Sequence, residues 1–478
     1  MSLKKLMHTH LFVDLSRFIL LILIFSANPA WGSQDSQAAI FVSEKETIYI
    51  TDAKLAKRRP NLMLFSCSYG AGHKMASQGI IESLPDCTIH MVDIYEGPLR
   101  SLDLLRSISP QFSNQQIYNE MAKKEQNRLL NFMAKIAPQA LLWQREKVED
   151  LLSTYVLRHK PDMLISCTPL VNSMLLEVAK KFDIPLLVVT TDIDISAFCY
   201  GLDSKCAFEN PQKFRITVPY AEESWKNQFG QHYPQTIQKT FQYSFGYPTR
   251  RVFAEQIEAS VLEQLRSAYE IKNDENVILV MMGGNTAQAA QVYAKLLLGM
   301  SEGEINQIVG NNPKRSKIHL ICLCGDVSQM ANHSLMTQLN QLNRTHYRQN
   351  NRVRIHACPG TTKIAELVSL PELFTVISKP GGSTVNEMIK KKMPMIYHIS
   401  DIPLDWERGN MTYGEARHLG KHFQTSGKMD GCARAKLAGI LSTTFALHHQ
   451  MQSNSNLVPE AKIDFSHNLR TAVHQMLR

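Results

Sequence analysis

The stretch Ser378-Lys-Pro-Gly-Gly-Ser-Thr-Val-Asn-Glu387 contains the turn that decides the fold. It follows Leu373-Phe-Thr-Val-Ile377, a β-branched and aromatic run that predicts a buried strand. The Pro-Gly-Gly turn ends this strand, and Ser383 or Thr384 can cap a helix that begins there. A strand, a glycine turn and a helix N-terminus together present backbone N–H groups and a helix dipole to an anion.

The same stretch also has a purely structural interpretation. Thr384 and Glu387 are three residues apart, which is the spacing of a capping box. In that motif the carboxylate satisfies only the end of its own helix and binds no ligand. Taken alone, the stretch leaves both interpretations open.

Apolar strand patterns alternate with helical patterns on both sides of a central linker. The linker is Phe245-Gly-Tyr-Pro-Thr-Arg-Arg-Val-Phe253, which is rich in turn-forming and charged residues. Because strands alternate with helices, each half is expected to form a parallel sheet that is covered on both faces. We therefore predict an α/β protein in which two units face each other across a cleft, with the glycine turns at the carboxyl ends of the strands. The predicted strands are 61–68, 88–94, 162–166, 185–190 and 213–218 in the first unit, and 276–284, 317–323, 353–357, 373–377 and 395–397 in the second.

Composition restricts the class of partner. The 478 residues are 44% hydrophobic and 20% charged, which is typical of a globular protein. The net charge of +9 favours an anionic partner such as acidic lipid, nucleic acid or a nucleotide phosphate. No long basic tract is interleaved with aromatic residues, so nucleic acid is the least supported of the three. The nine cysteines lack zinc or redox spacing and favour neither a metal site nor a disulfide framework.

Two regions suggest a membrane. Lys4 and Lys5 precede the apolar run Phe18-Ile-Leu-Leu-Ile-Leu-Ile-Phe25, and Ala30-Trp-Gly32 resembles a cleavage site. Residues 1–35 are therefore expected to be a secretory signal or an uncleaved membrane anchor. The region Leu99–Leu151 is rich in basic, apolar and aromatic residues, which fits helices lying on an anionic membrane surface. Helices packed on a sheet give a similar pattern, so that alternative stays open.

Three further polar motifs follow predicted strands. In Tyr69-Gly-Ala-Gly-His73 the glycines allow close backbone approach, so Gly72 is a candidate ligand-binding position. His73 is a candidate general base at the start of a helix, or a histidine that only solvates a turn. Met281-Met-Gly-Gly284-Asn-Thr286 repeats the strand, glycine and helix order, or is only a tight turn. Asp401–Asn410 could offer a carboxylate and an amide to a sugar, or be an exposed loop.

Four of these motifs resemble, in order and spacing, one family of glycosyltransferases. They are Ser68–His73, Gly246–Phe253, Met282–Gly284 and Ser378–Glu387, with Glu407-Arg-Gly-Asn410 as a looser fifth match. The family is that of monogalactosyldiacylglycerol synthase and processive diacylglycerol glucosyltransferase, and the peptidoglycan N-acetylglucosaminyltransferase is more distant. The matches cover most of the chain from about residue 61 to about residue 421.

This resemblance implies two Rossmann-like domains of GT-B type and a membrane-associated enzyme. It implies inverting transfer of glucose or galactose from UDP-glucose or UDP-galactose to diacylglycerol, with no obligatory metal or cofactor. The implied domains are 60–247 for the acceptor and membrane side, 248–435 for the UDP-sugar, and a C-terminal helical segment at 436–478. The implied roles are ribose binding for Glu387, diphosphate binding for Gly381, Gly382, Ser383 and Thr384, nucleotide contacts for Gly284 and Asn285, and sugar contacts for Glu407 and Asn410. The catalytic candidate His73 would lie between acceptor and donor. Asp192 is a candidate catalytic or acceptor-site carboxylate.

The chain departs from the family pattern in two places. The segment after Asp192 lacks a histidine that the family usually has, and Trp406 stands where glutamine is common. Two alternatives therefore stay open beside glycolipid synthesis. One is an enzyme of the same architecture with another acceptor, or a UDP-sugar epimerase. The other is an inactive module that binds UDP or lipid.

Overall fold

The computed structural model describes residues 47–50, 59–70, 72–103, 105–106, 113–203, 208, 210–220, 232–283, 287–310, 317–346, 352–425, 427, 430–454 and 456–478. Within these ranges, no helix is long and apolar enough to cross a membrane. The predicted signal or anchor at 1–35 lies outside them, as do Gly284 and Asn285.

The N-terminal domain is built on a seven-stranded sheet with the order β1-β3-β2-β4-β5-β6-β7. Strand β1 pairs antiparallel with β3, and all other pairs are parallel. The strands are β1 Thr47–Ile50, β2 Asn61–Ser66, β3 Thr88–Asp93, β4 Met163–Ser166, β5 Leu186–Val188, β6 Phe214–Thr217 and β7 Phe241–Gln242. The helices include α2 Gly72–Ser83, α4 Asn114–Lys123, α5 Asn127–Trp143, α6 Arg145–His159 and α7 Asn172–Lys181.

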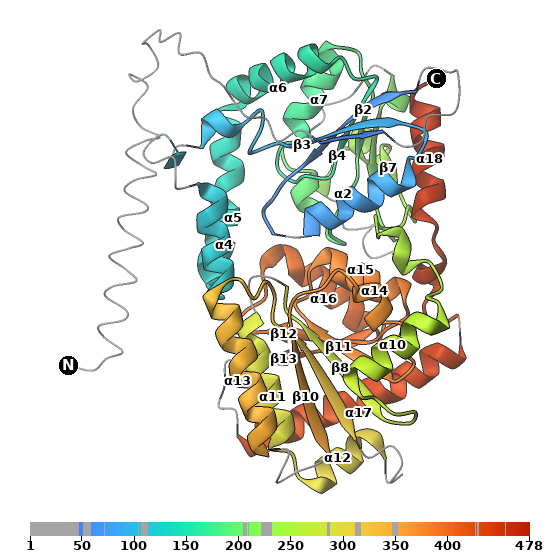
Figure 1. Ribbon diagram of the computed structural model, residues 1–478. Helices are drawn as coiled ribbons and strands as arrows, with labels where there is room; N and C mark the ends of the chain where they lie inside the picture. The colour runs from blue at the N-terminus through green and yellow to red at the C-terminus, as the bar shows by residue number, and fades with distance from the viewer. Residues whose placement is uncertain are drawn as a thin grey trace, which may run out of the picture. The chain divides into compact units, whose positions relative to one another are not determined.

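The C-terminal domain is built on a six-stranded, all-parallel sheet with the order β10-β9-β8-β11-β12-β13. Its strands are β8 Asn276–Met281, β9 Ile318–Leu323, β10 Val353–Cys358, β11 Leu373–Ser378, β12 Met395–Ile399 and β13 Gly420–Gln424. Its helices include α10 Ala259–Tyr269, α11 Ala290–Leu298, α12 Glu302–Val309, α13 Met330–His346, α14 Ile364–Leu367, α15 Gly382–Lys390, α16 Asp405–Ala416 and α17 Gly431–Ser453. Two Rossmann-like domains are thus present, as the sequence predicts (Figure 1).

The central strands of both sheets, among them β2, β4, β8 and β11, are buried on both faces and largely apolar. In β2, Leu62 and Leu64 pack with α2 on one face, whereas Met63 and Phe65 pack with α6 and α7 on the other. All four side chains are at most 1% exposed. Alternate strand residues point to opposite faces, so a continuous apolar run is what a strand buried on both sides requires.

The C-terminal residues are shared between the domains. Helix α17 packs on the C-terminal sheet through Leu437 and Leu441. The final helix, α18 (Phe465–Met476), runs beside α2 and packs into the N-terminal core through Leu469 and Val473 (Figure 1). The chain therefore passes between the domains a second time after the linker at 245–253.

The two passages between the domains lie against each other at Gly246. This residue has φ +85°, a left-handed conformation that favours glycine. A Cβ there would lie 3.0 Å from Ile463 Cγ2 and 3.2 Å from Phe465 Cβ. A side chain at position 246 would thus be strained and would push the two passages apart.

Helices α4 and α5, from the basic and aromatic region, pack against the C-terminal domain. Met121 and Leu130 form a small apolar cluster with Leu404. Asn127 Nδ2 donates to Ile402 O at 2.7 Å, and Arg128 Nε donates to Asp401 at 2.7 Å. The inner face of these helices is therefore protein core. Their other face exposes apolar side chains, among them Phe132 at 40% and Trp143 at 74%.

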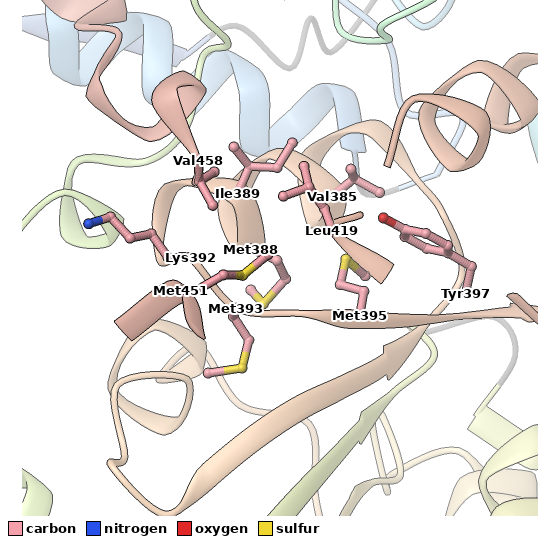
Figure 2. A pocket seen from close by; sticks show the side chains of 10 residues that line it. All are labelled: Val385, Met388, Ile389, Lys392, Met393, Met395, Tyr397, Leu419, Met451 and Val458. Carbon is pink, nitrogen blue, oxygen red and sulfur yellow. The ribbon is translucent and has the colours of Figure 1, made fainter. Parts of the chain in front are cut away.

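Behind α15 lies an apolar core rich in methionine. Met388, Met393, Met395 and Met451 face one another there beside Tyr397 (Figure 2). The cavity between them has a volume of about 10 Å³. This is room for one water molecule at most, so it is a packing gap and no ligand site.

Candidate active site

The glycine turn after β11 leads directly into α15. The helix begins at Gly382, and its N-cap is Gly381, which makes no side-chain capping hydrogen bond. Our expectation that Ser383 or Thr384 caps the helix, or that Thr384 and Glu387 form a capping box, is therefore wrong. Because Gly381 takes the extended conformation of an N-cap (φ −67°, ψ 142°), the helix starts too early for either motif. The first turn of α15 thus has no side-chain cap of its own.

The N-terminus of α15 lies against the segment that follows β5 in the other domain. A Cβ on Gly382 would be 2.0 Å from Thr191 O and 2.9 Å from Asp192 Oδ1, so only glycine fits here. Ser383 Oγ donates to Gly72 O at 2.9 Å, which brings the turn to the start of α2. Tyr247 Oη donates to Thr191 O at 2.9 Å. Four of the predicted site residues, Gly72, Asp192, Gly382 and Ser383, are thereby brought together.

His73 is the second residue of α2 and is half-buried. Its Nδ1 lies 3.0 Å from the carbonyl oxygen of Cys167 and 3.0 Å from Thr191 Oγ1. A carbonyl only accepts, so we assign the proton to Nδ1, which leaves the lone pair on Nε2. Burial lowers the pKa of His73, although the charge of Asp192 opposes this change. The ring is therefore neutral at pH 7 and able to accept a proton at Nε2.

Asp192 is held by an amide from the other domain. Asn410 is fully buried; its Nδ2 donates to Asp192 Oδ1 at 3.0 Å and to Pro380 O at 3.1 Å. Its Oδ1 accepts from Ile193 N at 2.9 Å. Burial raises the pKa of Asp192 to about 7, and the hydrogen bond from Asn410 and the charge of His73 both oppose the rise. The amide hydrogens of Asn410 therefore bind protein oxygens in this structure. Its predicted sugar contact stays a prediction.

Glu407 lies next to the glycine turn. It is the third residue of α16, and its Oε1 is 3.7 Å from where a Cβ on Gly381 would be. Burial raises its pKa, and the positive charge of Lys379 opposes the rise. Glu407 is thus close enough to contact a ligand bound at this turn.

Glu387 forms a buried ion pair with Arg250. The guanidinium places both Nε and Nη2 at 2.8 Å from Glu387 Oε1, and the two side chains are 5% and 12% exposed. The guanidinium carbon also lies 4.8 Å from the centre of the Phe253 ring. Burial raises the pKa of Glu387 to about 7, whereas the charge of Arg250 opposes the rise. Ribose binding by Glu387 stays a prediction. Thr384 is the third residue of the same helix, and its predicted diphosphate contact also stays a prediction.

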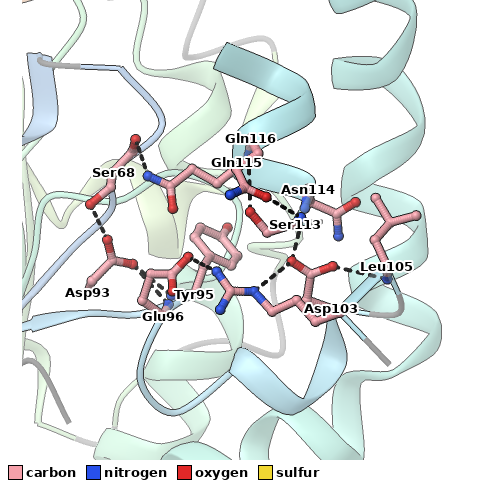
Figure 3. Close-up of polar contacts among 11 residues, drawn as sticks. Ser68, Asp93, Tyr95, Glu96, Asp103, Leu105, Ser113, Asn114, Gln115 and Gln116 are labelled. Carbon is pink, nitrogen blue, oxygen red and sulfur yellow. Dashed lines mark hydrogen bonds and ion pairs between the residues drawn. The ribbon is translucent and has the colours of Figure 1, made fainter. Parts of the chain in front are cut away.

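A polar network holds the loop that leads to His73 (Figure 3). The Ser68 hydroxyl donates to Asp93 at the end of β3. Gln115 of α4 donates from Nε2 to Ser68 O at 2.9 Å. Helix α4 therefore supports the glycine loop as well as the contact with the C-terminal domain.

Several contributors were not identified as site residues from the sequence. Arg250 and Tyr247 lie in the stretch Gly246–Phe253, which we interpreted only as a linker and family motif. Cys167 acts through its backbone carbonyl, which no sequence pattern reveals. Gly284 and Asn285 lie outside the described residues, so their predicted contacts stay predictions. Across the described ranges, no group of three or more His, Cys, Asp or Glu side chains could hold a metal ion.

Comparison with known proteins identifies the architecture. No protein-family model matches the sequence, and no curated protein matches it. A UDP-glucosyltransferase from Polygonum tinctorium is similar in structure, with a TM-score of 0.52 and 12% identity over 88% of this chain and 99% of that one. UGT89C1 of Arabidopsis thaliana complexed with UDP has a TM-score of 0.51 and 12% identity, over 88% and 100%. TcCGT1 in complex with UDP has a TM-score of 0.52 and 10% identity, over 87% and 99%. At this level of identity the likeness establishes the fold, and the chain has the two-domain GT-B fold of glycosyltransferases.

Proposed function

We propose that this protein transfers a hexose from a UDP-sugar to a lipid hydroxyl. The observation that carries the proposal is the position of His73. Its Nε2 keeps its lone pair, and the residue before it, Gly72, accepts a hydrogen bond from Ser383 in the first turn of α15. A base for an acceptor hydroxyl and a site for an anionic leaving group are thus neighbours. Structural neighbours of the same fold bind UDP or are UDP-glucosyltransferases, which supports UDP-sugar as the donor.

In the proposed reaction the acceptor hydroxyl loses its proton to Nε2 of His73 while its oxygen attacks the anomeric carbon. The bond to UDP breaks on the opposite face, so the configuration inverts. Asp192 stabilises the imidazolium, since the opposite charges favour each other. The N–H groups and dipole of α15 stabilise the negative charge that develops on UDP. No cofactor takes part in this scheme.

The finer proposal is that the donor is UDP-glucose or UDP-galactose and the acceptor is diacylglycerol. The ordered sequence motifs support it, as does the face of α5 on which Phe132 and Trp143 are exposed. Apolar side chains next to basic ones suit an enzyme that works at an anionic membrane surface. We accordingly propose a membrane-associated location, in which residues 1–35 act as a signal or an anchor.

The test uses the full chain, isotopically labelled UDP-glucose or UDP-galactose, and vesicles that contain diacylglycerol. We expect a glycolipid whose mass equals diacylglycerol plus one or more hexoses, and loss of product in His73→Ala. The matched control is His333→Ala, which removes an exposed histidine from α13. Conversion of one UDP-sugar into the other without acceptor would favour an epimerase. UDP binding without any turnover would favour an inactive module, and either result would contradict the proposal.

A further inference from the structure

The linker between the domains is clamped against α2. A Cβ on Gly79 would lie 2.5 Å from Pro248 O and 2.8 Å from Thr249 O, so the backbones are in direct contact. Two residues further on, the backbone N–H of Arg251 donates to Glu82 Oε2 at 2.6 Å. Helix α2 carries His73 at its N-terminal end, so the linker is fixed to the helix of the proposed base.

The opposite side of the same linker is fixed to α15. Arg250 donates a hydrogen bond from Nε to Oε1 of Glu387, and its Nη2 forms an ion pair with the same oxygen. Its guanidinium lies beside the Phe253 ring, which belongs to the same segment. Arg250 is therefore held from two directions, and the orientation of the Glu387 carboxylate depends on it. A planar guanidinium fixes a carboxylate in a way that a lysine ammonium does not.

We propose that Arg250 is a positioning residue that aims Glu387 Oε2 at the ribose hydroxyls of the nucleotide. The proposal rests on the proposed function and on the ribose contact that the family resemblance implies for Glu387. Arg250 occupies Oε1 and leaves Oε2 to accept from the ligand. Because Arg250 belongs to the linker, recognition of the ribose is tied to the segment that also holds the helix of His73. Donor recognition and domain position are thereby coupled through one side chain.

This role differs from two others that a buried arginine could have. If the ion pair were purely structural, removing Arg250 would lower stability and would affect the binding of all nucleotides alike. If Arg250 bound the diphosphate, removing it would weaken the binding of all nucleoside diphosphates equally. Only a residue that orients Glu387 changes the preference for a ribose over a deoxyribose. The preference, measured as a ratio of dissociation constants, is thus the informative quantity.

The experiment measures binding of UDP and 2′-deoxy-UDP to the full chain by calorimetry. We expect the wild type to bind UDP at least about tenfold more tightly, since the buried carboxyl group of Glu387 would lose a hydrogen-bond partner in the deoxy nucleotide. Glu387→Gln and Arg250→Ala should each bring the ratio close to one. The double variant should show no further change, because both substitutions remove the same interaction. The matched control is Arg251→Ala, since this neighbouring side chain is 77% exposed, and it should keep the wild-type ratio.

Arg250→Lys covers the case in which Arg250→Ala does not fold. It keeps the charge but loses the two-point contact, so we expect a reduced ratio with a melting temperature near that of the wild type. Retention of the full ratio in either folded variant would overturn the inference, as would equal weakening of both nucleotides. A wild type that does not bind UDP, or that binds it without any ribose preference, would overturn the proposed role of Glu387 as well. The failure of the inference alone is therefore distinguishable, because Glu387→Gln would then lose the preference and Arg250→Ala would keep it.

Discussion

Gly382→Ala tests whether the contact between α15 and the N-terminal domain is required for turnover. The added methyl group would lie 2.0 Å from Thr191 O, whereas an ordinary contact begins at about 3.4 Å. The two segments must therefore separate by about 1.4 Å at this point. Both partners are backbone or short side chains, which cannot turn aside. The distance between His73 and the proposed leaving-group site increases by a similar amount.

The size of the effect follows from this separation. Overpacking a close contact costs about 1–3 kcal/mol. This cost would reduce the population of molecules that keep the contact between α15 and Thr191 by about 5- to 150-fold. A misplacement of about 1 Å between reacting groups lowers turnover by about 100-fold. We therefore expect kcat to fall by one to two orders of magnitude. The melting temperature should change little, because the apolar cores of both domains are untouched.

The assay compares kcat for hexose transfer in Gly382→Ala, in the wild type and in a glycine control. Gly439→Ala is the control, since a Cβ at this position of α17 meets nothing within 4 Å. We expect it to keep wild-type turnover. If Gly382→Ala also kept wild-type turnover, the contact between α15 and Thr191 would be irrelevant to the reaction, and our interpretation of the site would be refuted.

Three further predictions concern local physical chemistry. Thr384→Ala should lower the free energy of unfolding by less than about 0.5 kcal/mol, because the helix does not use this side chain as a cap; thermal melting would show it, and a loss near 1 kcal/mol would contradict the observed N-cap. Asn410→Ala should shift the rising limb of the pH–kcat profile to higher pH, since its hydrogen bond lowers the pKa of Asp192; an unchanged limb would exclude Asp192 from the rate. Acid should destabilise the protein between about pH 6.5 and pH 4, because burial lowers the pKa of His356 to about 4 and also lowers that of His319. As the pH falls, the unfolded chain binds these protons before the folded chain does, so the stability present above pH 6.5 is lost towards pH 4. The loss is at most about 3 kcal/mol for His356, and less after solvent screening. A midpoint of urea unfolding that does not change over this range would contradict this prediction.

The sequence predicts those parts of the fold that local patterns determine. The run Leu373–Ile377 is apolar at every position, and the structure buries all of it in β11. The glycine turn that follows does connect strand to helix, and the linker around Gly246 does join two α/β units. Each of these follows from residue type and periodicity within one short window.

Features that depend on distant partners were not predictable. The close approach of Gly382 to Thr191 joins residues that are 191 positions apart in the chain, and no local pattern reveals it. The ion pair of Glu387 requires Arg250, which a linker motif does not reveal. Helix α18 packs on the N-terminal domain because Leu469 contacts the apolar side of α2. The sequence pattern of α18 alone does not reveal which surface it packs against. Local pattern gives the elements, whereas the site arises where elements from both domains meet.

The most direct test of the central claim compares turnover with nucleotide affinity in His73→Ala. We predict that kcat for hexose transfer falls by about 100-fold or more, as for a lost general base, while the UDP dissociation constant stays within about threefold of wild type. A turnover that is unchanged, or that falls only as much as UDP affinity does, would contradict the claim that Nε2 of His73 accepts the acceptor's proton.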